Sequence, residues 1–248
     1  MKTLLFATAF TVAALAAAPS FAQVSGYAGA SVTHAELDTP IGNADGESFS
    51  AGGSLFARSN ETLGFQFDLS GSDADDVEGT LSGAAHVVGD MSNGRIGAFV
   101  AASTTDGDTL WGVGAEGQTY VNEQITVAGT LAYAKSDEAD IELVGVNGQG
   151  RYFASDNFRV DANIGYADVQ DVDVSFWVAG LGAEYQFAAA PISLFGGYSH
   201  VTVDDADISA DIVSLGVRFN FGGLSLKQRD RTGASAQGLG ALTNGLVF

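Results

Sequence analysis

A closed antiparallel β-barrel of twelve strands that spans a membrane is the fold class that the sequence predicts, and two observations predict it. Twelve short segments of alternating apolar and polar residues run from Val24 to Phe221. The connections between them alternate too, because loops rich in aspartate are followed by short turns, several of them flanked by arginine. An even number of antiparallel strands with tight turns at one end is typical of bacterial outer-membrane barrels. The chain is therefore expected to be all-β.

The predicted strands follow one another with little chain between them. In order, their cores cover residues 24–36, 47–58, 62–71, 77–89, 95–104, 109–120, 124–134, 140–153, 158–167, 173–187, 192–203 and 209–221. A tilted strand needs roughly 9 to 11 residues to span a bilayer, and each core is at least about that long. The turns lie at residues 59–61, 91–94, 121–123, 155–157 and 188–191.

Period-two alternation is clearest in the strands that follow a turn. In the segment 62–71, Leu63 and Phe65 face one way, whereas Gln66 and Asp68 face the other. Alternation of this kind places one face of a strand against lipid and the other toward the lumen. A helix would instead repeat its apolar residues about every 3.6 positions.

The pattern weakens in the segment 140–153. Val144 and Val146 fall out of phase with Ile141 and Leu143. The sequence leaves two interpretations here, a β-bulge or a misplaced strand.

The N-terminus has the features of a secretory signal. Residues 1–22 combine Lys2 and an apolar stretch with a small-x-small site at Ser20-Phe21-Ala22. This pattern predicts cleavage before Gln23 rather than a spanning helix. The chain has no cysteine, so an exported protein must close its fold without disulfides. A barrel in which every strand is paired satisfies that requirement.

Charge excludes one class of partner. The formal net charge is −20. Because such a chain repels phosphate backbones, nucleic-acid binding is not expected.

Aromatic residues gather near the turn ends of the strands. A girdle at the membrane interface is the predicted role, since amphipathic rings prefer the headgroup level. Strand propensity alone is the alternative for single cases. The residues concerned are Phe56, Phe65, Phe67, Phe99, Tyr120, Tyr152, Phe153, Phe158, Tyr185, Phe187, Phe195, Phe219 and Phe221.

Charge asymmetry predicts the orientation in a Gram-negative outer membrane. Five arginines lie beside the turns, whereas most of the acidic residues lie in the loops. With an even strand count both chain ends fall on the turn side, which predicts short periplasmic turns, periplasmic termini and short acidic extracellular loops. The outer leaflet and its lipopolysaccharide are the expected surroundings. The loop residues are Asp38, Asp45, Glu47, Asp73, Asp75, Asp76, Glu78, Asp106, Asp108, Asp137, Glu138, Asp140, Asp168, Asp171, Asp173, Asp204, Asp205 and Asp207.

The last predicted strand, residues 214–221, has Gly216 and then aromatic residues at alternate positions, Phe219 and Phe221. It resembles the C-terminal assembly signal of the Gram-negative outer-membrane β-barrel superfamily. The resemblance implies that the barrel-assembly machinery recognises this strand. The opening Val24-Ser25-Gly26-Tyr27 and the chain length also resemble small porin-like proteins of alphaproteobacteria.

Inward-facing polar residues near the turn end are the candidate lumen and selectivity residues. Two functions are compatible with them: a passive channel for small hydrophilic solutes, or a closed structural or surface-interaction barrel braced by the same residues. If the channel is open, acidic loops at its mouth predict a preference for cations. The candidates are Gln66, Asp68, Arg95, Glu116, Gln118, Arg159, Asp161, Glu184, Gln186 and Arg218, with Asn220 beside them.

A C-terminal tail, residues 222–248, follows the last strand. Its composition is that of a flexible periplasmic extension. The sharper hypothesis is that Lys227, Arg229 and Arg231 enter the lumen and plug it, or touch the cell wall. The barrel domain is accordingly placed at residues 23–221.

Other chemistries find little support. The acidic loops could bind divalent cations that bridge them to lipopolysaccharide, but only Asp73-Ala74-Asp75-Asp76 approaches a calcium loop, so no defined metal site or cofactor is predicted. Ser199 and His200 are neighbours on one strand and point to opposite faces, so they cannot act as nucleophile and base. No Gly-x-Ser-x-Gly elbow occurs, and catalysis is not expected.

Overall fold

A computed structural model describes residues 24–74, 77–136, 138, 140–170, 174–204 and 206–243. The predicted signal, residues 1–22, lies outside the described residues, as do Asp75, Asp76, Asp137, Asp171, Asp173 and Asp205 of the loops. In the part of the chain that is described, no helix has the length and hydropathy needed to cross a membrane.

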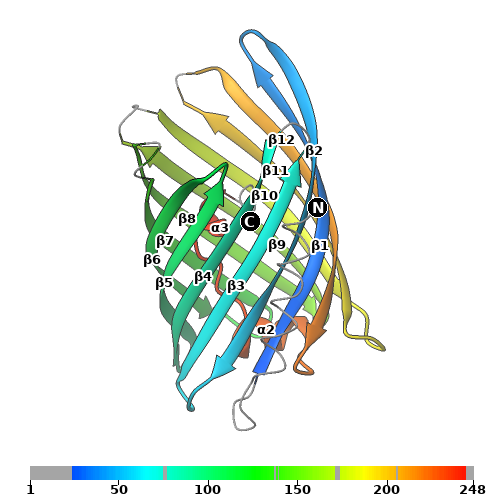
Figure 1. Ribbon diagram of the computed structural model, residues 1–248. Helices are drawn as coiled ribbons and strands as arrows, with labels where there is room; N and C mark the ends of the chain where they lie inside the picture. The colour runs from blue at the N-terminus through cyan, green and yellow to red at the C-terminus, as the bar shows by residue number, and fades with distance from the viewer. Residues whose placement is uncertain are drawn as a thin grey trace.

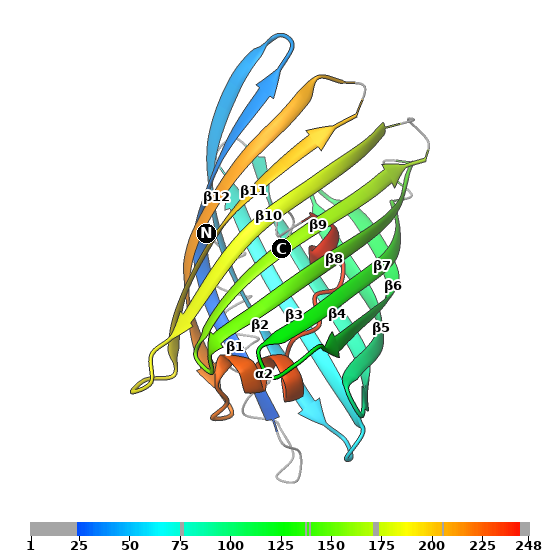
Figure 2. The same ribbon diagram turned by 180° about the vertical axis from the view of Figure 1, so that it is seen from behind.

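Twelve antiparallel strands form one closed barrel (Figures 1 and 2). Each strand pairs with its sequence neighbours, and β1 pairs with β12 to close the sheet, for example at Gly26 and Phe221. The predicted fold class is confirmed. The strands are β1 (Val24–Thr39), β2 (Gly42–Arg58), β3 (Leu63–Ala74), β4 (Val77–Met91), β5 (Gly94–Thr105), β6 (Asp108–Tyr120), β7 (Ile125–Ser136), β8 (Ile141–Ser155), β9 (Phe158–Val169), β10 (Val174–Gln186), β11 (Ile192–Val203) and β12 (Ile208–Phe221).

The two ends of the barrel differ, and they are called here the turn end and the loop end. The turn end carries the connections after β2, β4, β6, β8 and β10, and the loop end carries those after the odd-numbered strands. Val24 and Phe221 both lie at the turn end. The first hairpin is longer than predicted, because β1 and β2 continue as a paired ribbon to Thr39 and Gly42 and protrude at the loop end (Figure 1).

At Val144 and Val146 the eighth strand shows neither a bulge nor a misplaced register. Its pairing with β7 is regular from Ile125 opposite Tyr152 to Ser136 opposite Ile141. The register shift lies instead at the turn end, between Phe153 and Ser155 in the pairing with β9. Leu143 is an apolar residue on the lumen face, where it packs against an interior cluster described below.

The predicted aromatic girdle is wrong for several of its members. Phe56, Phe99 and Phe153 are 1%, 4% and 1% exposed and are part of the barrel interior. Phe195 also faces the lumen, beside Arg218. Phe56 has the same phase along β2 as the buried Ser54, so it points inward with it. Other members, including Phe67, Tyr152, Tyr185, Phe187 and Phe219, are exposed on the outside.

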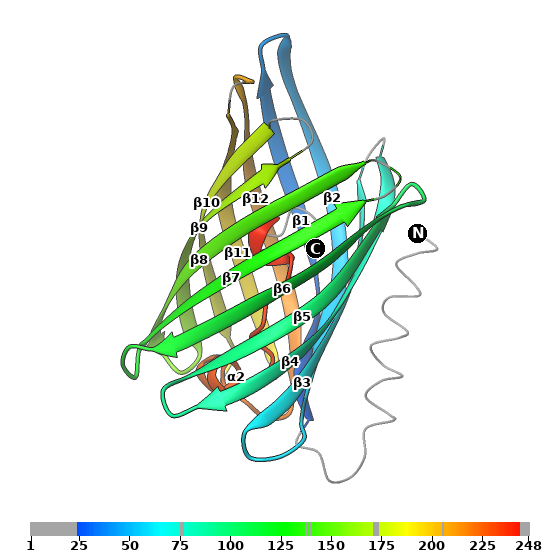
Figure 3. The ribbon, with the colours of Figure 1, turned by 90° about the vertical axis from the view of Figure 1, so that its left-hand side faces the viewer.

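The chain after β12 turns back into the barrel. Two short helices follow, α2 (Leu226–Thr232) and α3 (Gly240–Thr243). Figure 3 shows α2 at the turn end, with the segment after it running up inside the barrel to α3. The expectation of a free extension is therefore wrong for residues 224–241. Leu226, Arg229, Asp230, Ala234, Leu239 and Ala241 are all buried.

Candidate functional site

The candidate site is the lumen at the turn end, where the C-terminal segment forms hydrogen bonds with inward side chains of eight strands. Helix α2 begins at a capping box: the Ser225 hydroxyl accepts from the Gln228 backbone N–H, and the Gln228 side chain accepts from the Ser225 N–H. These bonds satisfy N–H groups that have no partner inside the helix. The cap fixes the direction of α2 and so presents Arg229 and Asp230 to opposite parts of the wall.

Glu184 on β10 is the anchor for Arg229. The carboxylate is 1% exposed, and its two oxygens lie 3.0 and 2.9 Å from Nη2 of Arg229. Arg218 on β12 donates to the same carboxylate at 2.8 Å, and Ser193 donates through its hydroxyl at 2.6 Å. Arg159 is 3.4 Å away. One buried carboxylate is thus shared by three guanidinium groups.

The Arg229 guanidinium has further partners. It donates to the Asn220 side-chain oxygen, and it lies 5.0 Å from the ring centre of Tyr27. Burial lowers the pKa of Arg229, and the Glu184 carboxylate opposes that effect. An arginine keeps its charge across the physiological range, so this contact is an ion pair.

Asp230 makes a second anchor on the other side of α2. Its carboxylate accepts from Nη1 of Arg151 on β8 at 2.5 Å and from the Thr126 hydroxyl on β7 at 2.8 Å. Gln118 on β6 donates to the Asp230 backbone carbonyl at 2.7 Å. Arg151, Thr126 and Asp230 are all nearly fully buried. Buried charges of this kind are stable only when they are paired and hydrogen-bonded.

Beyond α2, the chain backbone is held by side chains of the wall. Arg95 on β5 donates to the Gly233 carbonyl at 2.7 Å. Gln66 on β3 makes two bonds with Ala236, donating to its carbonyl at 2.8 Å and accepting from its N–H at 3.1 Å. The Gln237 N–H donates to Glu116 at 3.2 Å. The wall residues that contact the tail, among them Glu184, Arg95 and Gln66, therefore surround it on several sides.

A buried histidine supports the upper part of this segment. His86 on β4 is 1% exposed, with Nδ1 2.7 Å from Glu116 and Nε2 2.8 Å from Asp68. Gly238 lies against its ring and has a φ of +56°, a conformation that favours glycine. His86 therefore orders the two carboxylates beside the tail.

The segment ends in an apolar cluster. Leu239 is 5% exposed and packs with Phe99, Ala101, Ala132 and Ala134 of β5 and β7. Gly112 on β6 makes room for it, because a Cβ at that position would lie 2.5 Å from a Leu239 methyl group. An apolar patch on the lumen wall is unusual where most inward residues are polar. Leu239 of the tail packs against this patch.

Truncation of Leu239 tests whether this cluster holds the tail. We expect Leu239→Ala to weaken docking by about 2 kcal/mol, the low end for a buried leucine because a cavity adjoins the site. Trypsin should then cut faster at Lys227, Arg229 and Arg231 in the detergent-folded protein. Leu194→Ala, which truncates an outward leucine of β11, is the matched control. Equal cleavage in both variants would contradict the role of the cluster.

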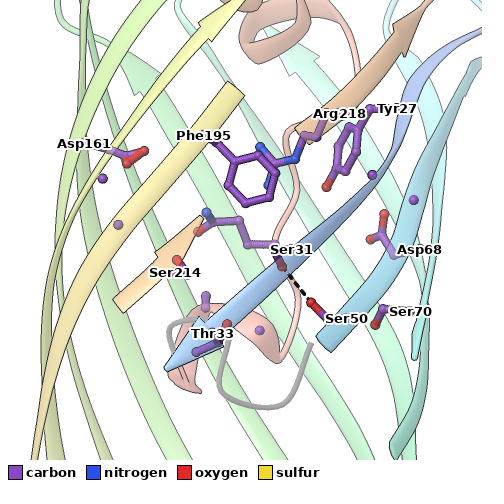
Figure 4. A pocket seen from close by; sticks show the side chains of 18 of the residues that line it. Tyr27, Ser31, Thr33, Ser50, Asp68, Ser70, Asp161, Phe195, Ser214 and Arg218 are labelled. Atoms are coloured by element: carbon purple, nitrogen blue, oxygen red, sulfur yellow. Dashed lines mark hydrogen bonds between the residues drawn. The ribbon is translucent and has the colours of Figure 1, made fainter. Parts of the chain in front are cut away.

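A cavity of about 390 Å³, lined by polar and by apolar groups, remains in the lumen beside the tail. Tyr27, Arg159 and Arg218 lie at its turn-end limit, and Leu239 to Ala241 form part of its wall. In Figure 4 the Arg218 side chain lies between the rings of Phe195 and Tyr27. The guanidinium carbon is 4.0 Å and 4.8 Å from the two ring centres. Such stacking holds the arginine in place.

The ten predicted lumen residues all lie on the inner wall. Gln66, Arg95, Glu116, Gln118, Glu184 and Gln186 contact the tail directly, Gln186 through the Leu224 carbonyl at 3.2 Å. Asp68 binds His86, Asp161 binds Arg159, and Arg218 binds Glu184. Their role in selectivity stays a prediction.

Sequence reasoning missed three residues of the site, namely His86, Arg151 and Asp230. In the sequence Arg151 is one of the five arginines beside the turns, and nothing distinguishes His86 from an ordinary strand residue. Arg229 was considered only as part of a cationic cluster, without its partner. The phase of β8 would have placed Arg151 on the same face as Asn147, but no sequence signal pairs it with Asp230.

Comparisons with known proteins bear on the fold. No protein-family model matches the sequence, and no curated protein matches it either. The chain has the fold of an outer-membrane β-barrel. The KdgM porin is 11% identical over 77% of this chain and 99% of its own, with a TM-score of 0.56. An outer-membrane channel from Pseudomonas putida F1 is 12% identical over 79% and 95%, with a TM-score of 0.57.

The translocator domain of the autotransporter NalP from Neisseria meningitidis is similar to the same degree. It is 15% identical over 86% of this chain and 93% of its own, with a TM-score of 0.56. Identities this low establish a shared fold and leave the substrate of this chain open. The resemblance to the alphaproteobacterial porin type stays a prediction.

Proposed function

We propose that this protein is an outer-membrane, porin-like channel for passive diffusion of small hydrophilic solutes, and that its own C-terminal segment closes the turn end of the lumen. The observation that carries the proposal is the combination of a cavity with many polar lining groups inside a closed barrel and a tail held by specific contacts. Porin and channel neighbours of the same fold support the channel class.

The proposed orientation places the turn end in the periplasm. Both termini of the barrel lie at that end, as expected for an even number of strands. Phe219 is exposed on the outer surface of β12, and Phe221 has the same phase, whereas Gly216 lies against the lumen-facing Phe195. This arrangement supports recognition of β12 by the barrel-assembly machinery. The acidic loops would then face lipopolysaccharide.

Cation preference is proposed to come from the loop end rather than from the lumen wall. Inside the lumen, the charges are balanced in local pairs, such as Glu184 with Arg229 and Asp230 with Arg151. The unbalanced negative charge of the chain lies largely in the loops. Acidic groups at a channel mouth concentrate cations and exclude anions.

Reversal potentials in a KCl gradient test this preference. We expect the protein lacking residues 223–248 to conduct K⁺ more readily than Cl⁻. The triple variant Asp38→Asn, Asp45→Asn and Asp106→Asn should move the reversal potential toward zero. The control neutralises Glu61 and Glu123 at the turn end and should have a smaller effect. Anion preference in the parent would refute the proposal.

A closed structural barrel is the second candidate function. The observation that favours it is the tail network itself, which braces β3, β5, β6, β7, β8, β10 and β12 from inside. In that case the acidic loops would hold divalent cations that bridge to lipopolysaccharide. Cells lacking the protein would then become more sensitive to EDTA, and the tail-deleted protein would stay silent in bilayers.

The placement of the serine and histidine pair supports a non-enzymatic role. Ser199 is buried on the lumen side and lines the cavity, whereas His200 lies on the outer face with Nδ1 2.8 Å from Asp211. The two side chains are thus on opposite sides of the wall and cannot act together.

A further inference from the structure

The cavity beside the tail has walls of two different chemistries. One wall belongs to β8 and β9 and presents amides: Asn147, Gln149 and Asn163. The other carries hydroxyl groups of serine and threonine (Figure 4). The volume of about 390 Å³ lies in the range of ligand pockets. The hydroxyl wall is formed by Ser31, Thr33, Ser50, Ser70, Ser82, Ser199 and Ser214.

The amide wall contains buried donors without partners. Asn147 is 4% exposed, and its Nδ2 has no hydrogen-bond partner among the described residues. The Nδ2 of Asn163 on the neighbouring strand also has none. Asn163 on β9 lies opposite Gln149 on β8, and Asn147 lies two residues before Gln149 on the same face of β8, opposite Gly165. The three amides are therefore neighbours on one part of the inner wall. A buried donor without a partner is destabilising, which favours a ligand that supplies an acceptor.

The hydroxyl wall can both donate and accept. Ser31 and Ser50 bind each other at 2.7 Å across β1 and β2, as the dashed line in Figure 4 shows. Each hydroxyl group has one donor and two acceptor positions, so a pair of this kind keeps free capacity toward the cavity. A ligand that meets both walls must therefore carry groups that donate as well as accept.

The charged groups of the cavity are already paired. Asp161 lies 3.1 Å from Arg159, Arg218 lies 2.8 Å from Glu184, and Asp68 lies 2.8 Å from His86. Gly182 lets the Asp161 side chain lie against β10, since a Cβ there would come within 2.5 Å of its carboxylate. With two acidic and two arginine side chains on its lining, the cavity offers no excess of either sign. A neutral ligand fits it better than an ion.

We propose that this cavity is a binding site for a neutral polyhydroxylated solute of about the size of a hexose. Hydroxyl groups of the solute accept from Asn147 and Asn163 and exchange hydrogen bonds with the serine wall. The tail takes part, because Gln237, Leu239 and Gly240 complete the cavity. The inference names a substrate class for the proposed channel and rests on that function, but binding at the site does not require conduction.

Isothermal titration of the detergent-folded, full-length protein with D-glucose tests the site. We expect saturable binding that Asn147→Leu and Asn163→Leu each weaken by roughly tenfold, the effect of losing one buried hydrogen bond. Asn43→Leu, on the exposed first hairpin, is the matched control and should bind like the parent. Heat-modifiable gel migration shows whether each variant is folded.

Two charged relatives of the probe complete the test. Glucuronate and glucosamine should bind more weakly than glucose, because the cavity has no unpaired charge to receive them. Absence of saturable glucose binding, tighter binding of either charged sugar, or equal losses in Asn43→Leu and Asn147→Leu would overturn the inference. Should Asn147→Leu not fold, Asn163→Leu alone decides. Saturable binding by a protein that never conducts would keep the site and refute the channel.

Discussion

Deletion of residues 223–248 is expected to convert a barrel of low conductance into one that conducts severalfold more in a planar bilayer. In the intact chain, α2 and the segment after it lie across the turn end and form hydrogen bonds with eight strands. No strand is shortened by the deletion, because β12 ends at Phe221. The barrel should therefore still close while its lumen becomes continuous.

The expected increase in conductance depends on the side chains that line the lumen after the tail has been deleted. Many inward positions are glycine, alanine, serine or threonine, including Gly29, Ser31, Gly52 and Gly182. Small side chains cannot fill a barrel of this strand number by themselves. The volume that α2 and Leu239 occupy would become open to water.

Single-channel recordings of the two proteins under the same KCl concentration measure the change. A deletion of residues 244–248 alone is the control and should behave like the intact chain. A synthetic peptide of residues 222–248, added to the deleted barrel from the turn side, should restore the block. A peptide with Arg229→Ala and Asp230→Ala should not. Equal conductance of the intact and deleted proteins would show that the tail does not close the lumen.

Glu184→Gln should destabilise the turn end far more than Arg229→Gln does. Removing the carboxylate leaves Arg159, Arg218 and Arg229 together in a buried place without their shared counter-charge. Breaking a buried ion pair by removing one partner costs about 3–5 kcal/mol. Removing Arg229 instead leaves Glu184 paired with Arg218 and Arg159, so the loss is confined to the tail contact.

Thermal unfolding and conductance separate these two effects. Glu184→Gln should lower the unfolding temperature of both the intact and the tail-deleted barrel, because Arg159 and Arg218 belong to the wall. Arg229→Gln, which is made in the intact chain because the deleted barrel lacks residue 229, should lower the unfolding temperature less than Glu184→Gln does and should raise the frequency of open events. If Arg229→Gln destabilises as much as Glu184→Gln, the carboxylate is not the centre of the network.

The strands could be predicted from the sequence because each one carries its own signal. Alternation of lipid-facing and lumen-facing residues located the eleventh strand at residues 192–203, which is where the structure has it. Alternation does not predict the full length of the first hairpin. The ribbon from Leu37 to Glu47 is largely exposed on both faces, so its apolar residues do not fall on one face. Aromatic character alone does not separate interior phenylalanines from those of a girdle, whereas strand phase does, because Phe56 shares its face with Ser54 and Phe153 shares its face with Arg151.

The tail could not be placed from the sequence, because its partners are distant and its signals are local. The capping box at Ser225 and Gln228 predicts a helix start but not a position inside a barrel. Arg229 meets Glu184, and Asp230 meets Arg151, across gaps of 45 and 79 residues. Each of these charges has many opposite charges to choose from in the sequence. The closed barrel determines which charges pair, because it brings inward-facing residues of distant strands together around the tail.

A disulfide between the tail and the wall tests the central claim most directly. The chain has no cysteine, and a Cβ at Gly238 would lie 3.8 Å from the Cβ of Ala84, which is the usual separation in a disulfide. The double variant Ala84→Cys and Gly238→Cys should therefore cross-link in the outer membrane. With Arg229→Gln added to weaken the docking of the tail, its conductance should be low when oxidised and rise on reduction. Failure to cross-link, or conductance that does not depend on the disulfide, would contradict a tail that occupies and closes the lumen.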